Sequence, residues 1–473
     1  MIARIARKEF TEMARDGRFR LAAGIVMALL LASLALGWSH YRDVNAQHEE
    51  ARRSTRQQWL KQGRKNPHSA AHYGIYAFKP KMPLSLVDRG VDAYTGVAAW
   101  LEAHKQNEFK YRPAQDATAV ARFGELTAAA VLQLLIPLLI ILLAFPAFAA
   151  ERELGTLRQL MSLGVLPSDL ALGKGMGIAA ALGTLLVPAT AVGVTAIGLA
   201  SGADALGADA GRLAVMALGY LLYFGTFVGL ALAVSALSGS SRTALILLLG
   251  FWIANGLIAP RVASDLARRM HPTPSALEFG LGIEEDIKNG LSGHDPADRR
   301  AKELEARVLA QYKVKSVAEL PVSFTGIALQ EGEEYGNQVF DKHYADLWGT
   351  FSRQDDVHRA ASAFAPLLAV RSLSMGLAGT DSAQHRDFAA AAERYRRALV
   401  KRMNDDVTEH GKSAGRGYVA SEDLWAKIPN FEYSAPGLGR ILAGEWPSLV
   451  VLSAWFVATA TAAVVVTARM RAS

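Results

Sequence analysis

Six stretches of the sequence are long and apolar enough to cross a lipid bilayer as helices. A bilayer core is about 30 Å thick and an α-helix rises about 1.5 Å per residue, so a span needs roughly 20 apolar residues. The six expected spans cover residues 21–38, 126–150, 175–200, 213–237, 243–259 and 447–468. Two long charge-rich blocks separate them, at 39–125 and 260–443. This segregation excludes an ordinary soluble enzyme and predicts an all-α polytopic membrane protein.

The charges that flank the spans predict which side of the membrane each segment occupies. Short flanks rich in Lys and Arg stay in the cytoplasm. Such residues gather before the first span, in the loops after the second and fourth spans, and in the C-terminal tail. They are Arg4, Arg7, Lys8, Arg15, Arg18, Arg20, Arg152, Arg158, Lys174, Arg242, Arg469 and Arg471. We therefore expect cytoplasmic termini, a cytoplasmic loop at 151–174, and both long blocks outside.

The first 20 residues predict an amphipathic helix on the inner membrane surface. Ile2, Ile5, Ala6, Phe10 and Met13 recur at helical spacing, with basic residues between them. A cleavable signal peptide is the competing interpretation. Its apolar core is usually 7–15 residues long, whereas the first span here has 18 residues.

The two long blocks predict one mostly helical extracytoplasmic domain. Apolar side chains repeat every three or four residues over 297–312, 354–378 and 384–407, and a charged run at 42–65 is also typical of a helix. Because the blocks leave the membrane after spans one and five, we expect them to fold together, with about 270 residues around a shared core.

Several kinds of chemistry are missing from the sequence. The chain has no cysteine, which excludes disulfides, thiolate metal sites and cysteine nucleophiles. It contains no G-x-x-x-x-G-K-[ST] phosphate loop, no H-E-x-x-H and no G-x-S-x-G. No basic stripe is interleaved with aromatic residues, so nucleic-acid binding is not expected. We predict no catalytic residue and no ATP hydrolysis by this chain.

All 11 histidines fall in the two long blocks. His68 and His72 are four residues apart and can share one helix face, a spacing that metal sites use. Apolar spans exclude histidine, however, so the blocks are most of what remains. Pro67 and Gly74 also disfavour a long helix there. We therefore expect no metal site.

The segment E-R-E-L-G-T-L-R-Q-L at 151–160 follows the second span directly. Leu154, Leu157 and Leu160 recur every third residue after the leading charges. This pattern predicts a short amphipathic helix. By itself, such a helix can simply lie on the membrane surface.

The same segment resembles the E-R/K-E-x-G-T-L-x-x-L signature of type-2 ABC transporter permeases. The matching positions are Glu151, Glu153, Gly155, Thr156, Leu157 and Leu160. In that family the segment is the coupling helix that docks in a groove of a separate ATPase subunit. The run A-R-K-E-F at 6–10 is similar to the motif of the family's N-terminal elbow helix. The stretch A-P-L-L-A-V-R-S-L-S-M at 365–375, with G-T-D at 379–381 and H-R-D-F at 385–388, resembles a bacterial subgroup with a large uncharacterised outer domain.

The resemblance implies roles for named residues and partners. Arg7, Lys8, Glu9 and Phe10 would belong to the elbow helix. Glu151, Arg152, Glu153 and Arg158 would set the docking on the ATPase, and Leu157 and Leu160 would fill its groove. Expected partners are two ABC ATPase subunits, a second copy of this permease or a related one, and membrane lipids. ATP and Mg²⁺ would be bound by the ATPase, with no cofactor in this chain.

The implied location is the bacterial inner membrane, with both termini cytoplasmic and the large domain in the periplasm, where it would meet cargo or a periplasmic protein. One alternative is a membrane scaffold whose periplasmic domain recruits partners without transport. A membrane enzyme and a metal-maturation transporter are further alternatives.

Overall fold

The computed structural model describes residues 1–116, 126–412 and 417–470, except for the side chains of residues 202–206 and 208. Within these residues, six helices are long and apolar enough to cross a membrane. They cover Gly17–Leu60, Ala128–Glu153, Pro167–Ser201, Asp209–Leu237, Ser241–Met270 and Leu438–Ala468. The prediction of a mostly helical chain with six helices able to cross a membrane is therefore confirmed.

The spans are built from helical elements that differ in regularity. They comprise α2 (Gly17–Leu60), α6 (Ala128–Ala130) with η3 (Val131–Leu135), α7 (Ile136–Ala144) and α8 (Ala149–Glu153), α10 (Pro167–Leu237), α11 (Ser241–Ile253) with η4 (Ala254–Ile258) and α12 (Ala259–Met270), and α19 (Leu438–Ala468). The elements η3 and η4 are π-helical turns, and each comes just before a proline, Pro137 and Pro260. Proline lacks an N–H group, and the wider turn accommodates that missing donor.

Several spans extend beyond the apolar stretches predicted for them. The third begins at Pro167 rather than at residue 175, the fifth ends at Met270 rather than at 259, and the sixth begins at Leu438 rather than at 447. Hydropathy marks only the apolar part of a helix, whereas its hydrogen bonds continue into the polar flank. The first span is the extreme case, because α2 continues unbroken for 44 residues.

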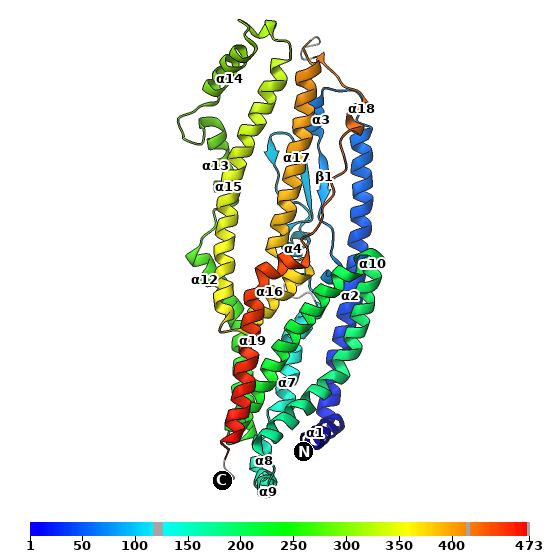
Figure 1. The fold of residues 1–473 in the computed structure, drawn as a ribbon, viewed down its shortest axis with the longest axis vertical. Helices are drawn as coiled ribbons and strands as arrows, with labels where there is room; N and C mark the ends of the chain where they lie inside the picture. The colour runs from blue at the N-terminus through cyan, green and yellow to red at the C-terminus, as the bar shows by residue number, and fades with distance from the viewer. Residues whose placement is uncertain (117–125, 413–416, 471–473) are drawn as a thin grey trace.

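The molecule is elongated, with the spans at one end and a second bundle beyond them (Figure 1). Both termini lie at the free end of the spans, next to α8 and to α9 (Thr156–Ser162). We call this the basal end. The remaining part, which we call the distal domain, consists of residues 42–116, 271–412 and 417–437. The upper part of α2 runs into it from the spans.

The distal domain is mostly helical. Its helices are α3 (Pro67–Tyr73), η1 (Pro83–Leu86), α4 (Asp92–Thr95), α5 (Pro113–Asp116), α13 (Ala276–Asn289), α14 (Ala297–Tyr312), η5 (Val317–Glu319), α15 (Phe324–Ser362), α16 (Pro366–Ala378), α17 (Ser382–His410) and α18 (Glu422–Ala426). It also holds an antiparallel sheet of β1 (Ile75–Phe78), β2 (Ala98–Glu102) and β3 (Lys105–Gln106), in the order β1-β2-β3. Ile75 pairs with Leu101, and Leu101 pairs with Gln106.

Two features of this domain differ from the sequence prediction. The helix expected over 354–378 is divided, because α15 ends at Ser362 and α16 begins at Pro366. Proline is tolerated in the first turn of a helix but breaks a helix interior. The sheet was not predicted at all, since strands of two to five residues are too short to show a clear alternation.

The two long blocks of sequence share one core in the distal domain. Trp59 of α2 and Trp425 of α18 are both fully buried, and their rings meet edge to face with centroids 6.0 Å apart. The indole Nε1 of Trp59 donates a hydrogen bond to the carbonyl of Trp425 at 3.0 Å. Phe388 and Leu399 of α17 belong to the same cluster. The first block therefore closes against the end of the second.

This core predicts that Trp59→Ala destabilises the distal domain by about 3–5 kcal/mol, because the change opens a cavity and removes a buried hydrogen bond. Circular dichroism of the purified full chain during denaturant unfolding would measure the loss. Trp446, which is 60% exposed, provides the matched control, and Trp446→Ala should change stability by no more than about 0.5 kcal/mol. Equal effects of the two substitutions would contradict the prediction.

Candidate functional site

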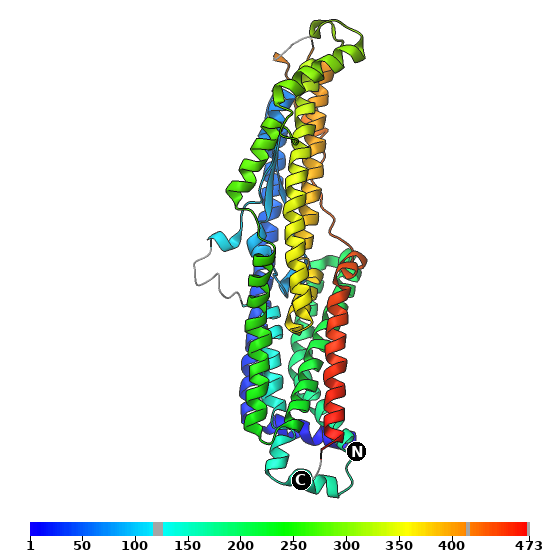
Figure 2. The same ribbon diagram turned by 90° about the vertical axis from the view of Figure 1, so that its left-hand side faces the viewer.

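The basal end brings the two sequence motifs together. The N-terminal helix α1 (Ile2–Arg15) lies crosswise at the base of the spans, and α8 and α9 project beside it (Figure 2). Asp16 ends α1, and its side chain accepts a hydrogen bond from the backbone N–H of Arg18 at 2.8 Å, which starts α2. Aspartate in this N-cap position satisfies a free donor of the new helix. The sharp turn between α1 and the first span therefore has a local cause.

Two glycines of α10 form the surface on which α1 rests. A Cβ atom on Gly173 would lie 2.6 Å from Cβ of Ile5, and one on Gly177 would lie 2.7 Å from Cβ of Glu9. Small residues one turn apart allow helices to approach closely. This G-x-x-x-G pair thus packs within the chain, against α1.

Lys174 lies between these glycines and connects three elements. Its ammonium Nζ donates to Oε1 of Glu9 in α1 and to Oε1 of Glu151 in α8, both at 2.8 Å. The lysine side chain is 2% exposed, and each glutamate side chain is 15% exposed. A charge buried this deeply requires opposite charges beside it. The segments at 6–10 and 151–160 are therefore joined by a residue that sequence analysis placed only among the cytoplasmic charges.

Arg152 and Glu153 bind the connection between the fourth and fifth spans. The guanidinium of Arg152 donates to the carbonyls of Ala236 and Ser238, at the C-terminal end of α10. Glu153 accepts from the backbone N–H and hydroxyl of Ser241, at 3.1 and 2.7 Å. These groups satisfy the free carbonyls of one helix end and a free N–H of the next. Both charged side chains thus hold the C-terminal end of α8 against α10 and α11.

Gly155 and Thr156 make the turn from α8 to α9. Gly155 has a φ of +74°, a left-handed conformation that glycine adopts without strain. The hydroxyl of Thr156 donates to the carbonyl of Glu151 at 3.2 Å. The G-T pair of the signature therefore has a structural explanation, since it makes the turn between α8 and α9.

The leucines of this segment differ in how far they are exposed. Leu157 is 3% exposed and belongs to the core of the spans, and Leu160 is partly buried against the same core. The exposed apolar side chains are instead Leu154 at 77%, Leu163 at 78% and Leu166 at 61%. Leu157 follows directly on the left-handed turn at Gly155, in the first turn of α9. Leu157 is therefore buried in this structure, and its expected role in docking stays a prediction.

A cleft of about 930 Å³ lies between α1 and α8–α9, and its lining includes Lys8 but not Arg7, Phe10 or Arg158. Lys8 lines it and is half-exposed, with Nζ 3.3 Å from Glu12 and 3.6 Å from Glu9. Arg7 and Arg158 are exposed, and Phe10 is partly buried. The cleft thus has charged residues of α1 on one side and Leu154 and Leu163 on the other.

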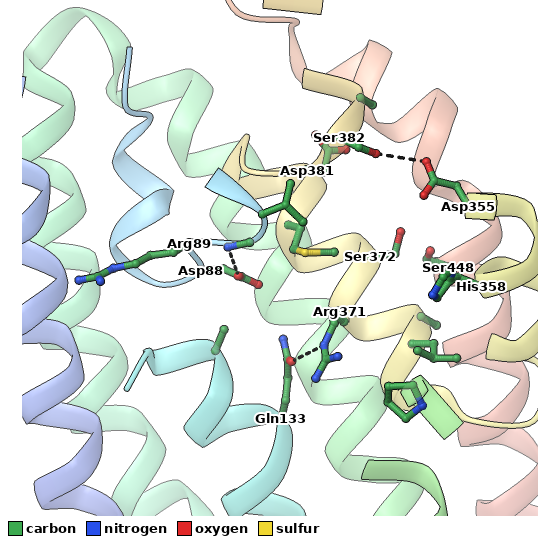
Figure 3. A pocket seen from close by; sticks show the side chains of 18 of the residues that line it. Asp88, Arg89, Gln133, Asp355, His358, Arg371, Ser372, Asp381, Ser382 and Ser448 are labelled. Atoms are coloured by element: carbon green, nitrogen blue, oxygen red, sulfur yellow. Dashed lines mark hydrogen bonds between the residues drawn. The ribbon is translucent and has the colours of Figure 1, made fainter. Parts of the chain in front are cut away.

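A second cavity, of about 670 Å³, lies where the spans meet the distal domain (Figure 3). Arg371 of α16 donates to Oε1 of Gln133 at 3.4 Å, and Ser374 donates to Oδ2 of Asp88 at 2.5 Å. Burial raises the pKa of the Asp88 carboxyl above its usual value, which favours its neutral form. The cavity walls therefore offer both donors and acceptors.

The cavity is also lined by the segment 365–388, on which the resemblance to the bacterial subgroup rests. Arg371, Ser372, Met375, Asp381 and Ser382 all line it. Ser382 lies at its upper edge and donates to Asp355 at 3.2 Å (Figure 3). The motif at 365–388 thus marks the junction between the spans and the distal domain.

A third cluster lies in the distal domain and involves histidine. His68 and His72 of α3 meet His104, which follows β2, and one nitrogen from each ring lies within 4.8 Å of the others. Sequence analysis found the first two but missed His104, which lies 32 residues after His72 in a turn of the unpredicted sheet. Imidazole nitrogens in such a group are suited to hold a transition metal.

Comparison with known families gives one match. Residues 276–434 match a protein-family model described as a domain of unknown function (DUF3526). This is 159 of the 473 residues, from α13 to the segment after α18, and it includes Arg371 and Asp381 of the junction cavity. No curated protein matches the chain. The similarity therefore covers much of the distal domain and assigns no activity to it.

The Lys174 contact predicts a large effect of Lys174→Met, because Glu9 and Glu151 would keep their charges without the lysine. We expect a loss of about 3–5 kcal/mol, visible as a lower thermal unfolding temperature of the detergent-solubilised chain. Lys8→Met is the matched control, since Lys8 is 54% exposed and its ion pairs contribute at most about 1 kcal/mol. Adding Glu9→Gln and Glu151→Gln to Lys174→Met should restore most of the stability. A stable single variant would contradict the assigned network.

Proposed function

We propose that this chain is the membrane-spanning permease subunit of an ATP-driven ABC transporter of type 2, which moves cargo across or out of the bacterial inner membrane. The observation that carries the proposal is the arrangement of the two sequence motifs at the basal end. There the E-R-E-L-G-T-L segment runs from α8, at the end of the second span, into the short helix α9, and Lys174 joins it to the N-terminal helix. A separate ATPase supplies the energy and binds ATP and Mg²⁺.

The ATPase docks on the exposed side of α8 and α9. Leu154, Leu163 and Leu166 are 61–78% exposed there and offer an apolar contact. Arg158, also exposed, adds charge at the rim. Apolar centres with charged rims are typical of protein interfaces. Glu151, Arg152 and Glu153 act differently, because their hydrogen bonds join α8 to α10 and to the start of α11 rather than to a partner.

Movement of the docked ATPase reaches the spans through the same contacts. A displacement of α8 acts on Lys174 through Glu151, and Lys174 acts on α1 through Glu9. The third span contains Lys174 itself, so α1 and α10 move with the coupling segment. ATP can shift this equilibrium only through contacts that differ between the two states. Two ATPases would act on two permeases, either two copies of this chain or this chain and a related one.

The distal domain faces the periplasm in this proposal, and the junction cavity is where cargo meets the spans. Its volume of about 670 Å³ lies in the range of small-molecule sites. Its walls carry polar groups from the spans and from the distal domain, including Gln133 and Asp88. Cargo bound here would contact both parts of the chain at once.

The first test is a pull-down of the tagged full chain from native membranes in mild detergent, followed by mass spectrometry. The proposal expects a stoichiometric protein with a Walker A motif. The double variant Leu154→Asp/Leu163→Asp should reduce its recovery at least tenfold, because each charge would be buried in the apolar contact, and tenfold corresponds to only about 1.4 kcal/mol. Leu277→Asp is the control, since Leu277 is 72% exposed on α13, far from the basal end. Recovery of the chain without any ATPase would instead support the membrane scaffold.

A second test concerns the turn between α8 and α9. Gly155→Pro cannot adopt a φ of +74°, because the proline ring fixes φ near −65°. We expect the variant to lose ATPase binding and permease-stimulated ATP hydrolysis. Gly293→Pro is matched, since Gly293 also has a positive φ, of +72°, with nothing near its Cβ position. Full stimulation by the Gly155 variant would overturn the assigned role of this turn.

A further inference from the structure

The three histidines are brought together by two local structures. Asn66 caps α3, and its side chain accepts from the backbone N–H of His68 at 2.9 Å. His68 and His72 then lie one turn apart on α3. The turn after β2 is held against this helix, because the backbone N–H of Ala103 donates to the carbonyl of Ala71 at 3.1 Å. His104 therefore faces both other rings.

The spacing of the rings fits one metal ion. Their centroids form a nearly equilateral triangle with sides of 4.8, 4.9 and 4.8 Å. Nε2 of His68 lies 3.2 Å from Nε2 of His104. Two nitrogens bound tetrahedrally at 2.0–2.1 Å from Zn²⁺ would be about 3.4 Å apart. This pair is therefore close to the required separation before any ion binds.

The opposite nitrogens of these two rings contact buried acceptors. Nδ1 of His104 lies 2.6 Å from Oε1 of Glu333, which is 3% exposed. Nδ1 of His68 lies 2.8 Å from Oδ1 of Asn404, which is fully buried. A neutral imidazole has one N–H, so an N–H directed at each acceptor leaves the Nε2 lone pairs facing one another. Outer hydrogen bonds of this kind orient the ligands of metal sites.

The backbone at His104 is held in an uncommon conformation. His104 has a φ of +67°, a conformation that is unfavourable for a residue other than glycine. The same Glu333 oxygen accepts its backbone N–H at 2.8 Å. Glu333 is in turn paired with Arg396, whose Nη1 lies 3.3 Å away and whose side chain is 1% exposed. A buried ion pair thus fixes both the backbone and the ring of His104.

We propose that His68, His72 and His104 bind a divalent transition-metal ion, such as Zn²⁺ or Cu²⁺, through three imidazole nitrogens. Imidazole ligands select these ions over Mg²⁺ and Ca²⁺. His72 and His104 are exposed, so the fourth position is open to solvent and can take water or a ligand from another molecule. Burial also lowers the pKa of His68 and His72, which favours the neutral rings that metals bind. The site does not depend on the proposed transport function.

The test uses the full-length chain in detergent, stripped with a chelator and titrated with Zn²⁺ by calorimetry at pH 7. We expect one Zn²⁺ per chain. His72→Gln and His104→Asn should each weaken binding by roughly 100-fold or more, the upper end of what loss of an outer hydrogen bond alone costs. Asparagine suits position 104 because it tolerates a positive φ. His294→Gln removes an exposed histidine elsewhere and should bind as the wild type does.

Electron paramagnetic resonance of the Cu²⁺-loaded protein gives a second measurement. The wild type should show three coordinated imidazole nitrogens, and each of the two variants should show two. If His104→Asn impairs folding, as judged by circular dichroism, His72→Gln carries the test, because His72 is exposed and forms no part of the core. Wild-type binding no tighter than that of His72→Gln would overturn the proposal and leave a hydrogen-bonded histidine pair.

Discussion

The backbone of this chain has to satisfy its own hydrogen bonds wherever it passes through an apolar layer, and the helix is the element that does so within one segment. Six such helices leave polar side chains few places except the ends of the bundle. The Lys174 contacts lie at one end and the junction cavity at the other. The same constraint explains why spans extend into the polar flanks, since a helix that leaves the bilayer can keep its hydrogen bonds.

A basic side chain is buried at the basal end and another in the distal domain, and each one contacts two carboxylates. Lys174 is enclosed by two glutamates from elements more than 100 residues apart in sequence. In the distal domain, Arg396 pairs with Glu333 and with Glu393, at 3.3 and 2.8 Å. Removing one partner of such a group is far more costly than the net contribution of the group itself. Arrangements of this kind therefore specify how segments meet more than they add stability.

The sequence predicted the six spans and the helical character of the distal domain because apolar length and helical periodicity are local properties. The break before Pro366 and the strand Ile75–Phe78 were missed, the first because the flanking residues continue the same apolar pattern and the second because four residues show too little alternation. The motif at 151–160 was visible, but the burial of Leu157 against the spans depends on contacts that the motif does not reveal. His104 and Lys174 gain their roles only from residues distant in sequence. Contacts between residues so far apart in sequence leave no local pattern in one amino-acid sequence.

The length of α2 has a mechanical consequence. With 44 residues in one unbroken helix, it is about 66 Å long, and its side chains pack against the spans at one end and against Trp425 at the other. A tilt of about 5° at its base would carry its far end through about 6 Å for a helix of this length. Because α1 joins α2 at Asp16, a small rotation below the membrane becomes a displacement the size of a side chain above it. A small tilt of α2 at the basal end is therefore amplified along its length into a larger movement in the distal domain.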